Sequence, residues 1–225
     1  AYCGESQNEA LAPTGSHTHM ASVATPPVPL MLPPGLVPYR LTVDQYEAMV
    51  DAGILTEHDR LELIEGMLVK KMTKKPDHSA GSEKGRRTID RALPAGWHTR
   101  HEQPIRIPPR DSEPEPDIAV VRGDVEDYIT RHPGAPDTAL VVEVARSSLA
   151  ADRALAKTYG GGGIPVYWIV NVVDRQLEIY AHPTDGVYPD PAILGETESV
   201  DLILADQVVA QIPVADLLPR KPGGA

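Results

Sequence analysis

The sequence predicts an α/β fold in which a mixed central β-sheet is flanked by α-helices, within one main domain of a 225-residue chain. Residues 139–180 carry most of this prediction, because they are typical of a strand, a helix, a glycine-rich break and two further strands. Residues 140–144 and 167–170 are short apolar runs of the kind found in strands buried on both faces. Residues 118–121 form a third such run. The chain is long enough to bury a substantial core.

The two ends of the chain differ from the middle. Residues 1–38 are predicted to be a disordered or tag-derived tail, in which residues 15–20 resemble a cloning remnant. Three prolines interrupt the apolar residues 28–37, which argues against a signal-peptide helix. Residues 39–218 are predicted to form a single domain, and residues 219–225 a loose C-terminal tail.

Composition excludes several classes of protein. With 32 acidic and 21 basic residues, the net charge of −11 argues against coating nucleic acid by bulk charge, although a locally basic groove remains compatible with it. Cys3 is the single cysteine, so an intrachain disulfide or a multi-cysteine metal site is excluded and a reducing compartment is favoured. No run of 18 apolar residues occurs, so we expect no membrane partner and a cytoplasmic location.

The domain is predicted to open with a helix over residues 42–52, with Thr42 as its N-cap and Gly53 just past its end. Residues 60–69 alternate between apolar and polar, and Glu65-Gly66 within them is a two-residue hairpin signal.

A basic segment follows in residues 70–91, which contain eight Lys or Arg and three acidic residues. Ser79 or Ser82 is predicted to start a helix that runs to about Leu93. Two interpretations remain open: the charges form an ordinary solvated helix face, or they contact phosphates. The candidate phosphate contacts are Lys84, Arg86, Arg87 and Arg91.

Two acidic residues stand where a buried strand is expected. Residues 97–107 are predicted to form a strand that ends before Pro108, and Pro116 then introduces the next one, so that Asp117 lies at its start. Glu143 lies inside the apolar run 140–144, where an unpaired carboxylate is costly unless it faces a cleft, a cation or a metal.

Asp117 and Glu143 are expected to meet if their strands are neighbours. Two adjacent carboxylates repel unless a cation lies between them, and oxygen ligands without thiolates favour Mg²⁺ or Mn²⁺ over Zn²⁺. The alternative is that both acids are ordinary turn-formers and caps.

The remaining elements are predicted from local signals. Ser147 and Ser148 offer N-cap oxygens to a helix over residues 150–158, and glycines 160–163 end it. Asp174-Arg175 is a hairpin turn, and residues 183–196 are expected to be loops. Residues 200–204 and 207–212 are predicted to form a hairpin, followed by a short segment ending at Leu218, both packed on the core sheet.

Several motifs in a fixed order resemble a known family. They are the ELxEG hairpin, a His in the basic stretch, EPDIAVV, ALVVEV, a Ser-rich turn, Asp then Lys and Tyr on a helix, Gly-Ile-Pro, and Tyr-Trp-Ile-Val. Over residues 41–180 the chain thus resembles the bacterial putative restriction endonuclease family of the PD-(D/E)XK nuclease superfamily. The resemblance implies a restriction-endonuclease-like core and a nuclease-like domain.

The resemblance also implies roles for particular residues. Pro116-Asp117 matches the PD and Glu143 the following acid, and these carboxylates would hold Mg²⁺, with Mn²⁺ as a substitute. Glu62 is the candidate third acid and Glu65 its alternative. His78 matches a family position, where it would contact phosphate or cap the basic helix.

The chain departs from the superfamily at the lysine, because Ala145 stands two residues after the acid. Lys157 on the following helix is the expected replacement, oriented by Asp152, and Lys70 or Lys71 is the fallback.

The resemblance implies a metal-dependent endonuclease that hydrolyses DNA phosphodiester bonds, with a homodimer plausible for double-strand cleavage. The alternative is a catalytically inactive nuclease fold that serves as a DNA-binding or oligomerising module. Metal binding at Asp117 and Glu143 distinguishes the two hypotheses.

Overall fold

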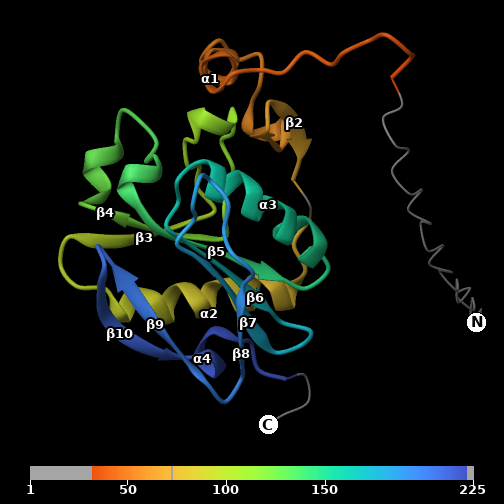
Figure 1. Cartoon of the computed structure of the whole chain (residues 1–225). Coiled ribbons are helices and arrows are strands. Elements are labelled where there is room, and N and C mark those ends of the chain that lie inside the picture. The colour runs from red at the N-terminus through yellow and green to blue at the C-terminus, as the bar shows by residue number, and fades with distance from the viewer. Residues whose placement is uncertain (1–31, 72, 222–225) are drawn as a thin grey trace, which may run out of the picture. The chain divides into compact units, whose positions relative to one another are not determined.

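The computed structural model describes residues 32–71 and 73–221 (Figure 1). The chain divides into two units, residues 1–38 and residues 39–225. In the first unit the described residues include a turn at residues 34–35. Cys3 and the predicted cloning remnant at residues 15–20 lie outside the described residues. In the part of the chain that is described, no helix is long and apolar enough to cross a membrane.

The second unit contains both helices and strands. The α-helices are α1 (Val43–Asp51), α2 (Pro76–Ala92), α3 (Leu149–Gly161) and α4 (Val214–Leu217). The strands are β1 (Leu61–Ile64), β2 (Met67–Lys70), β3 (Trp97–His101), β4 (Ile118–Arg122), β5 (Thr138–Ala145), β6 (Val166–Asn171), β7 (Gln176–Ala181), β8 (Ala192–Gly195), β9 (Ser199–Leu204) and β10 (Gln207–Pro213). Short 3₁₀ helices lie at Glu57–Asp59, Pro108–Arg110, Val125–Tyr128 and Ala135–Asp137.

A six-stranded sheet organises this unit, with strand order β3-β4-β5-β6-β7-β8. β5 and β6 are parallel and the other neighbours are antiparallel, so the sheet is mixed, as predicted. α3 makes the crossover from β5 to β6, which a parallel pair requires. β1 pairs with β2, and β9 with β10, in two separate two-stranded sheets.

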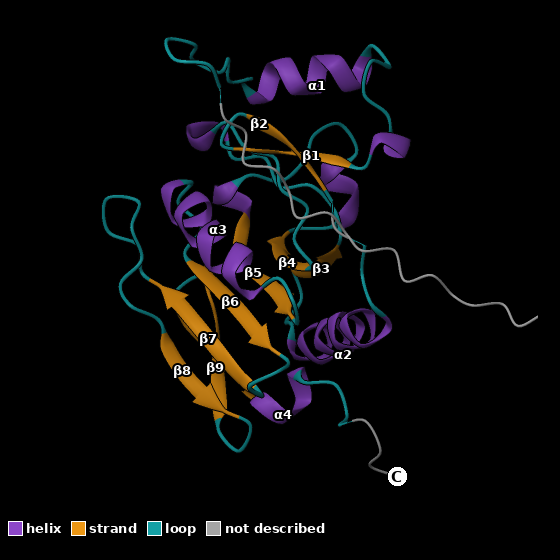
Figure 2. Cartoon of the chain, turned by 90° about the vertical axis from the view of Figure 1, so that its right-hand side faces the viewer, coloured by secondary structure: helices purple, strands orange, loops and turns teal. Residues whose placement is uncertain are grey.

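The two faces of the six-stranded sheet bury different cores. α3 lies on one side of the sheet and α2 with α4 on the other (Figure 2). On one face, Ile89 of α2, Val142 and Trp168 pack with side chains of the β9–β10 hairpin and α4. On the other, Val141 and Tyr159 pack among side chains from α3 and the central strands. Side chains alternate along a strand, so Glu143 points to the face that α3 covers. This places one carboxylate under a helix rather than in open solvent.

The local signals near the start of the domain are confirmed. Thr42 is the N-cap of α1 and forms a reciprocal capping box with Gln45. β1 and β2 form the predicted hairpin, and its turn residues Glu65 and Gly66 have φ of 50° and 75°. Gly66 must be small as well, because a Cβ there would lie 2.6 Å from the Cβ of Arg40. The C-terminal hairpin β9–β10 is also confirmed.

Three boundaries were predicted wrongly. α2 begins at Pro76 rather than at Ser79 or Ser82, because proline is well suited to the first helical turn. β3 ends at His101, and residues 105–107 contribute only isolated bridges and two buried isoleucines. Residues 192–195, expected to be a loop, form the edge strand β8.

α3 was predicted at residues 150–158 and extends over Leu149–Gly161. Ser148 is its N-cap by position, but its side chain makes no capping bond. The glycine run ends the helix as predicted, with Gly162 at the C-cap and Gly163 at φ 86°.

Candidate active site

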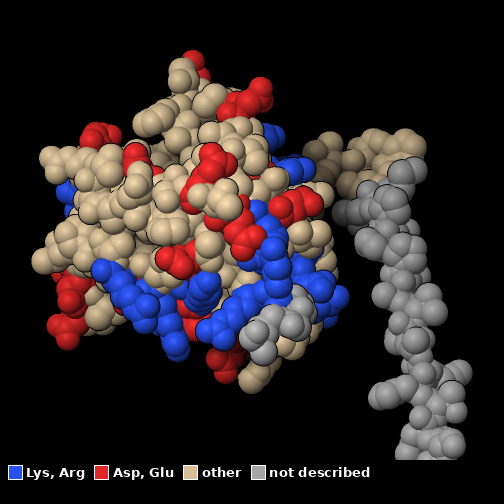
Figure 3. Space-filling view, turned by 90° about the horizontal axis from the view of Figure 1, so that it is seen from below, with Lys and Arg blue, Asp and Glu red and all other residues tan. Residues whose placement is uncertain are grey.

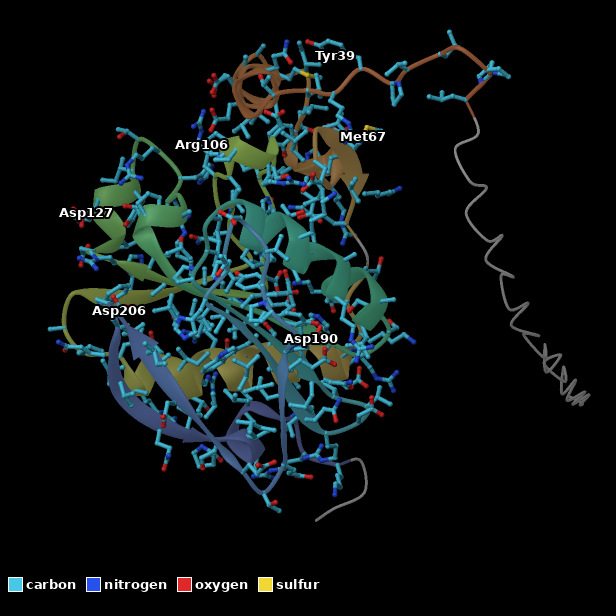
Figure 4. All side chains as sticks on the ribbon, viewed as in Figure 1. Tyr39, Met67, Arg106, Asp127, Asp190 and Asp206 are labelled. Atoms are coloured by element: carbon cyan, nitrogen blue, oxygen red, sulfur yellow. The ribbon has the colours of Figure 1, made fainter. Side chains whose placement is uncertain are left out.

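A large cleft, about 1560 Å³ in volume, opens on the side of the domain where α1 and the β1–β2 hairpin lie. Its lining comes from α1, the hairpin, the start of α2, the segment before β4, the end of β5, and α3. Figure 4 labels Arg106 beside α1 and Met67 on the hairpin, at the end of the molecule where this cleft is found. Asp117 and Glu143 both line the cleft, so the two acids singled out in the sequence share one space.

Asp117 is held by Lys74, by His78 and by a main-chain donor. It lies directly before β4 and is only 4% exposed. Lys74 Nζ donates to its Oδ1 at 2.8 Å, and His78 Nε2 lies 3.1 Å from its Oδ2. The N–H of Val144 also donates to Oδ2, at 2.8 Å. Burial alone would raise the pKa of Asp117, but His78 and Lys74 hold it below its usual range.

Glu143 has no cation partner among the described residues. Its Oε2 accepts the main-chain N–H of Asp117 at 3.3 Å, and its Oε1 accepts the hydroxyl of Tyr159 at 3.0 Å. Burial, followed by the nearby charges of Asp117 and Asp152, raises the pKa of Glu143 well above its ordinary value. An added positive charge beside Glu143 would therefore be stabilising.

The third acid was expected at Glu62 or Glu65, and the two residues have different surroundings. Glu62 lines the cleft, accepts the N–H of Glu115 at 3.0 Å, and has a pKa that burial raises. Glu65, in the hairpin turn, accepts hydrogen bonds from Arg110 Nε at 2.9 Å and Thr158 Oγ1 at 2.8 Å. Glu65 is thus occupied in joining the hairpin to α3, whereas Glu62 faces the cleft with fewer partners.

Lys157 lines the cleft but makes no hydrogen bond or ion pair with Asp117 or Glu143 in the described structure. Burial alone would raise the pKa of Glu65, but hydrogen bonds from Arg110 and Thr158 and the charge of Lys157 lower it. The effect of its charge indicates that Lys157 lies close to the hairpin turn.

Asp152, expected to orient Lys157, instead accepts the hydroxyl of Ser148 at 2.7 Å. Burial raises the pKa of Asp152 to about 6, and the charge of Asp117 adds to this rise while Ser148 opposes it. No hydrogen bond or ion pair joins Asp152 to Lys157 among the described residues, so the expected pairing is corrected: the partner of Asp152 is Ser148.

Lys74 is the site residue that sequence reasoning did not single out. Its ammonium bridges Asp117 and Glu102, the latter at 2.9 Å. Partial burial alone would lower the pKa of Lys74, but these two acids raise it. The only local signal was membership of the lysine-rich segment before α2, since the partner Asp117 lies 43 residues further along the chain.

The predicted phosphate contacts of α2 do not line the cleft, apart from His78 at its start. Lys84 donates to the carbonyls of Ala215 and Leu218, both at 2.8 Å, and so fastens α2 to the C-terminal segment. Arg86 and Arg87 both pair with Glu83, and Arg91 is exposed in the last turn. Figure 3 shows the underside of the molecule, where Lys and Arg side chains alternate with acidic ones.

The acid pair fits a hard divalent cation in its donor chemistry. Among residues 32–71 and 73–221, no three His, Cys, Asp or Glu side chains form a group that could hold a metal. Mg²⁺, however, is commonly bound by one or two carboxylates together with waters and substrate phosphates. A carboxylate offers about four lone-pair sites. Asp117 uses three of them and Glu143 two, so both retain acceptor capacity toward the cleft.

Comparison with known proteins gives one family and one fold. Residues 43–215 match the family described as "Uma2: Putative restriction endonuclease". Among solved structures, the chain is similar to a putative nuclease of the DUF820 group from Anabaena variabilis ATCC 29413, with a TM-score of 0.60 and 15% sequence identity. That match covers 79% of this chain and 97% of the other. No curated protein matches the sequence.

Proposed function

This chain belongs to the Uma2 family of putative restriction endonucleases, and on that premise we propose that it hydrolyses DNA phosphodiester bonds with a divalent metal, as an endonuclease. One observation carries the proposal. Glu143 is a carboxylate in a buried strand, beside Asp117, with its pKa raised and with no cation of its own among the described residues. A structural acid in that position would be expected to have a basic partner.

Asp117 and Glu143 are the residues that would hold Mg²⁺ or Mn²⁺, whereas Glu62 of the hairpin lines the same cleft but forms no three-residue metal group with them among the described residues. When bound, such an ion polarises a phosphoryl oxygen and lowers the pKa of a coordinated water. All other steps fall to the side chains of the cleft. Tyr159 and the main-chain N–H of Asp117 orient Glu143, and the N–H of Val144 orients Asp117.

Lys74 would supply a positive charge to the phosphate. Its ammonium has three donors, of which Asp117 and Glu102 take two. The third is available to a phosphoryl oxygen in the cleft, where a fixed charge is most effective as negative charge develops during hydrolysis. We therefore propose Lys74 for the role that the sequence suggested for Lys157.

The test is nicking of supercoiled plasmid DNA by the full chain with Mg²⁺ or Mn²⁺, beside Glu143→Gln. We expect the wild-type protein to convert the plasmid to open-circle DNA, and the variant to leave it supercoiled. Binding of Mn²⁺, measured by calorimetry without DNA, gives a second readout that does not depend on catalysis. Wild-type protein that neither binds Mn²⁺ nor nicks DNA would contradict the proposal.

A second candidate function is a nuclease fold that binds DNA without cutting it. Lys74 and His78 both contact the carboxylate of Asp117 and occupy acceptor sites that a metal would need, and this observation favours the second candidate. The same experiment separates the two functions, because a non-catalytic module would bind DNA with no change in plasmid topology and no Mn²⁺ binding that Glu143→Gln removes.

A further inference from the structure

The cations that line the cleft fall into two groups. Most are held by acids of the protein, as Lys74 is by Asp117, and as Arg106 is by Glu47 with Nε 2.8 Å from Oε1. Four others line the cleft, are exposed, and make no ion pair with another described residue. They are Arg60, Lys70, Lys75 and Lys157.

These four cations, called the rim cations below, come from three elements around the acid pair. Arg60 and Lys70 lie together at the open end of the β1–β2 hairpin, where Lys71 N–H donates to Arg60 O at 2.9 Å. Lys75 is the N-cap of α2 and follows Lys74, which holds Asp117. Along the chain, Lys70 thus precedes and Lys75 follows Lys74, the residue that contacts Asp117.

Lys157 lies on α3, near the other end of the hairpin. Its neighbour Thr158 donates to Glu65, which is in the hairpin turn. Figures 1 and 2 both show the hairpin beside α3. The strands of the hairpin are four residues long, so about 13 Å separate its open end from its turn. Duplex DNA carries roughly eight negative charges over that length.

An unpaired exposed cation is better suited to a phosphate than a paired one. A paired lysine must give up its carboxylate before it contacts phosphate, whereas an unpaired one only exchanges solvent and counterions. In this respect α2 differs from the rim, since Arg86 and Arg87 both pair with Glu83 and neither lines the cleft. The chain has a net charge of −11, so binding must rest on local cations rather than on bulk attraction.

We propose that the rim cations are the DNA-backbone contacts of this protein, and that the phosphate chain runs past the β1–β2 hairpin across the acid pair rather than along α2. The inference rests on the proposed function, because it takes the substrate to be DNA. It goes further in naming the element that holds the substrate, and it replaces the phosphate contacts that the sequence suggested on α2.

The experiment compares three double variants of the full chain, each of which lowers the positive charge by two. Lys70→Ala/Lys75→Ala removes two rim cations, and Arg86→Ala/Arg87→Ala removes the competing pair on α2. Arg220→Ala/Lys221→Ala is the matched control, because these residues lie away from the cleft and line a separate pocket. Binding to a fluorescent duplex is measured in EDTA, so that no cleavage occurs, at salt concentrations from about 50 to 200 mM.

We expect the rim variant to bind more weakly and to lower the slope of log affinity against log salt by roughly two, since each lost phosphate contact removes about one. The other two variants should keep the wild-type slope. Every substituted residue is exposed except Arg86, which is half-buried. Thermal denaturation verifies that each of the three variants is folded.

Three outcomes would overturn the inference. An equal loss in all three variants would assign binding to overall charge, and a loss confined to the α2 variant would restore the helix as the contact surface. Plasmid nicking by the wild-type chain distinguishes failure of the rim contacts from failure of the proposed function. Nicking with an unchanged slope in the rim variant refutes the rim alone, whereas wild-type protein that neither binds nor nicks DNA refutes the proposed function as well.

Discussion

Glu143 and Glu178 lie in one row of the six-stranded sheet, yet their surroundings are opposite. Glu143 pairs in register with Ile169, and Ile169 pairs in register with Glu178, so both carboxylates lie on the face that α3 covers. Glu178 is fully buried and receives two hydrogen bonds from Arg153, at 2.9 and 2.6 Å. From the described residues, Glu143 receives only a tyrosine hydroxyl and a main-chain N–H.

The difference teaches how to separate a structural acid from a functional one. A buried carboxylate that the fold itself requires is matched by a fixed cation, as Arg153 matches Glu178. A buried carboxylate without a cation partner destabilises the folded protein, and such groups cluster at functional sites. Asp117 is intermediate, because Lys74 forms an ion pair with it and His78 lies within hydrogen-bond distance, but both come from a segment that borders the cleft.

The largest effect should come from breaking this contrast at Glu143. We expect Glu143→Gln to lower the rate of DNA cleavage by roughly a thousandfold, because it removes one of the two acids that would hold the metal. The free energy of unfolding without metal should stay equal or rise, since a buried charge with no cation is removed. Plasmid nicking and urea denaturation measure the two effects.

Glu178→Gln is the matched control for Glu143→Gln. It should destabilise the protein, because Arg153 loses its charged partner, and it should leave the cleavage rate of the folded protein within a few-fold of wild type. If the two variants behaved alike in both measurements, the distinction between structural and functional acids in this sheet would be lost.

Lys74, the lysine that pairs with Asp117, allows a second comparison, with Lys157. Lys74→Ala should lower the cleavage rate by about a hundredfold, the scale seen when one oriented charge stabiliser is removed. Its affinity for Mn²⁺ should rise, because the ammonium no longer competes for Asp117. Lys157→Ala should cost less than about tenfold, since Lys157 contacts neither acid and acts on the backbone only. A larger loss in Lys157→Ala than in Lys74→Ala would return the catalytic role to α3.

The parts of the fold that were predictable from sequence are those fixed by local chemistry. The capping oxygen of Thr42, the turn residues Glu65-Gly66 and the apolar run around Glu143 each determine structure within a few residues. β8 was missed because its four residues show no alternating pattern, and its pairing with β7 decides its conformation. Short edge strands depend on tertiary context more than on propensity.

The candidate site was predictable in its acids and not in its cations. Asp117 and Glu143 stood out because a carboxylate is anomalous in a buried strand. Lys74 gave no such signal, since a lysine in a basic segment is ordinary until the fold brings it to Asp117. Arg86 and Arg87 illustrate the converse, because their partner Glu83 lies on the same helix turn and could have been identified from the i, i+3 and i, i+4 spacing.

Stability gives a third test, with a smaller expected effect. Asp117→Asn should lower the free energy of unfolding by about 1–3 kcal/mol in the absence of metal, because the ion pair of the buried carboxylate with Lys74 is lost when a neutral amide replaces it. Glu143→Gln should leave the free energy of unfolding equal or raise it, as argued above. Urea denaturation at pH 7 in EDTA measures both variants, and a stabilising Asp117→Asn would mean that the ion pair with Lys74 does not offset the cost of burying the acid.

The smallest expected effect concerns Glu113, a further buried carboxyl on the segment that leads to Asp117. Glu113 is 5% exposed, its Oε2 has no hydrogen-bond partner among the described residues, and burial, with the nearby charge of Glu47, raises its pKa to about 8. Its pKa in the unfolded chain is about 4.3. The folded state therefore keeps a proton that the unfolded state has lost between these two values, and the stability contributed by this group falls as the pH rises through that window.

Glu113→Gln removes this dependence, because an amide does not ionise. We expect the variant to match wild type near pH 4.5, where Glu113 is largely protonated in the folded protein, and to melt a few degrees higher at pH 8.5. Melting of both proteins across this range measures the difference. Glu178→Gln, whose wild-type carboxylate has Arg153 as a partner, provides the opposite control, since it should be less stable than wild type at pH 8.5. A Glu113→Gln protein that melts with the wild type at every pH would mean that this carboxyl reaches water or a cation in solution, and would place it with Glu178 rather than with Glu143.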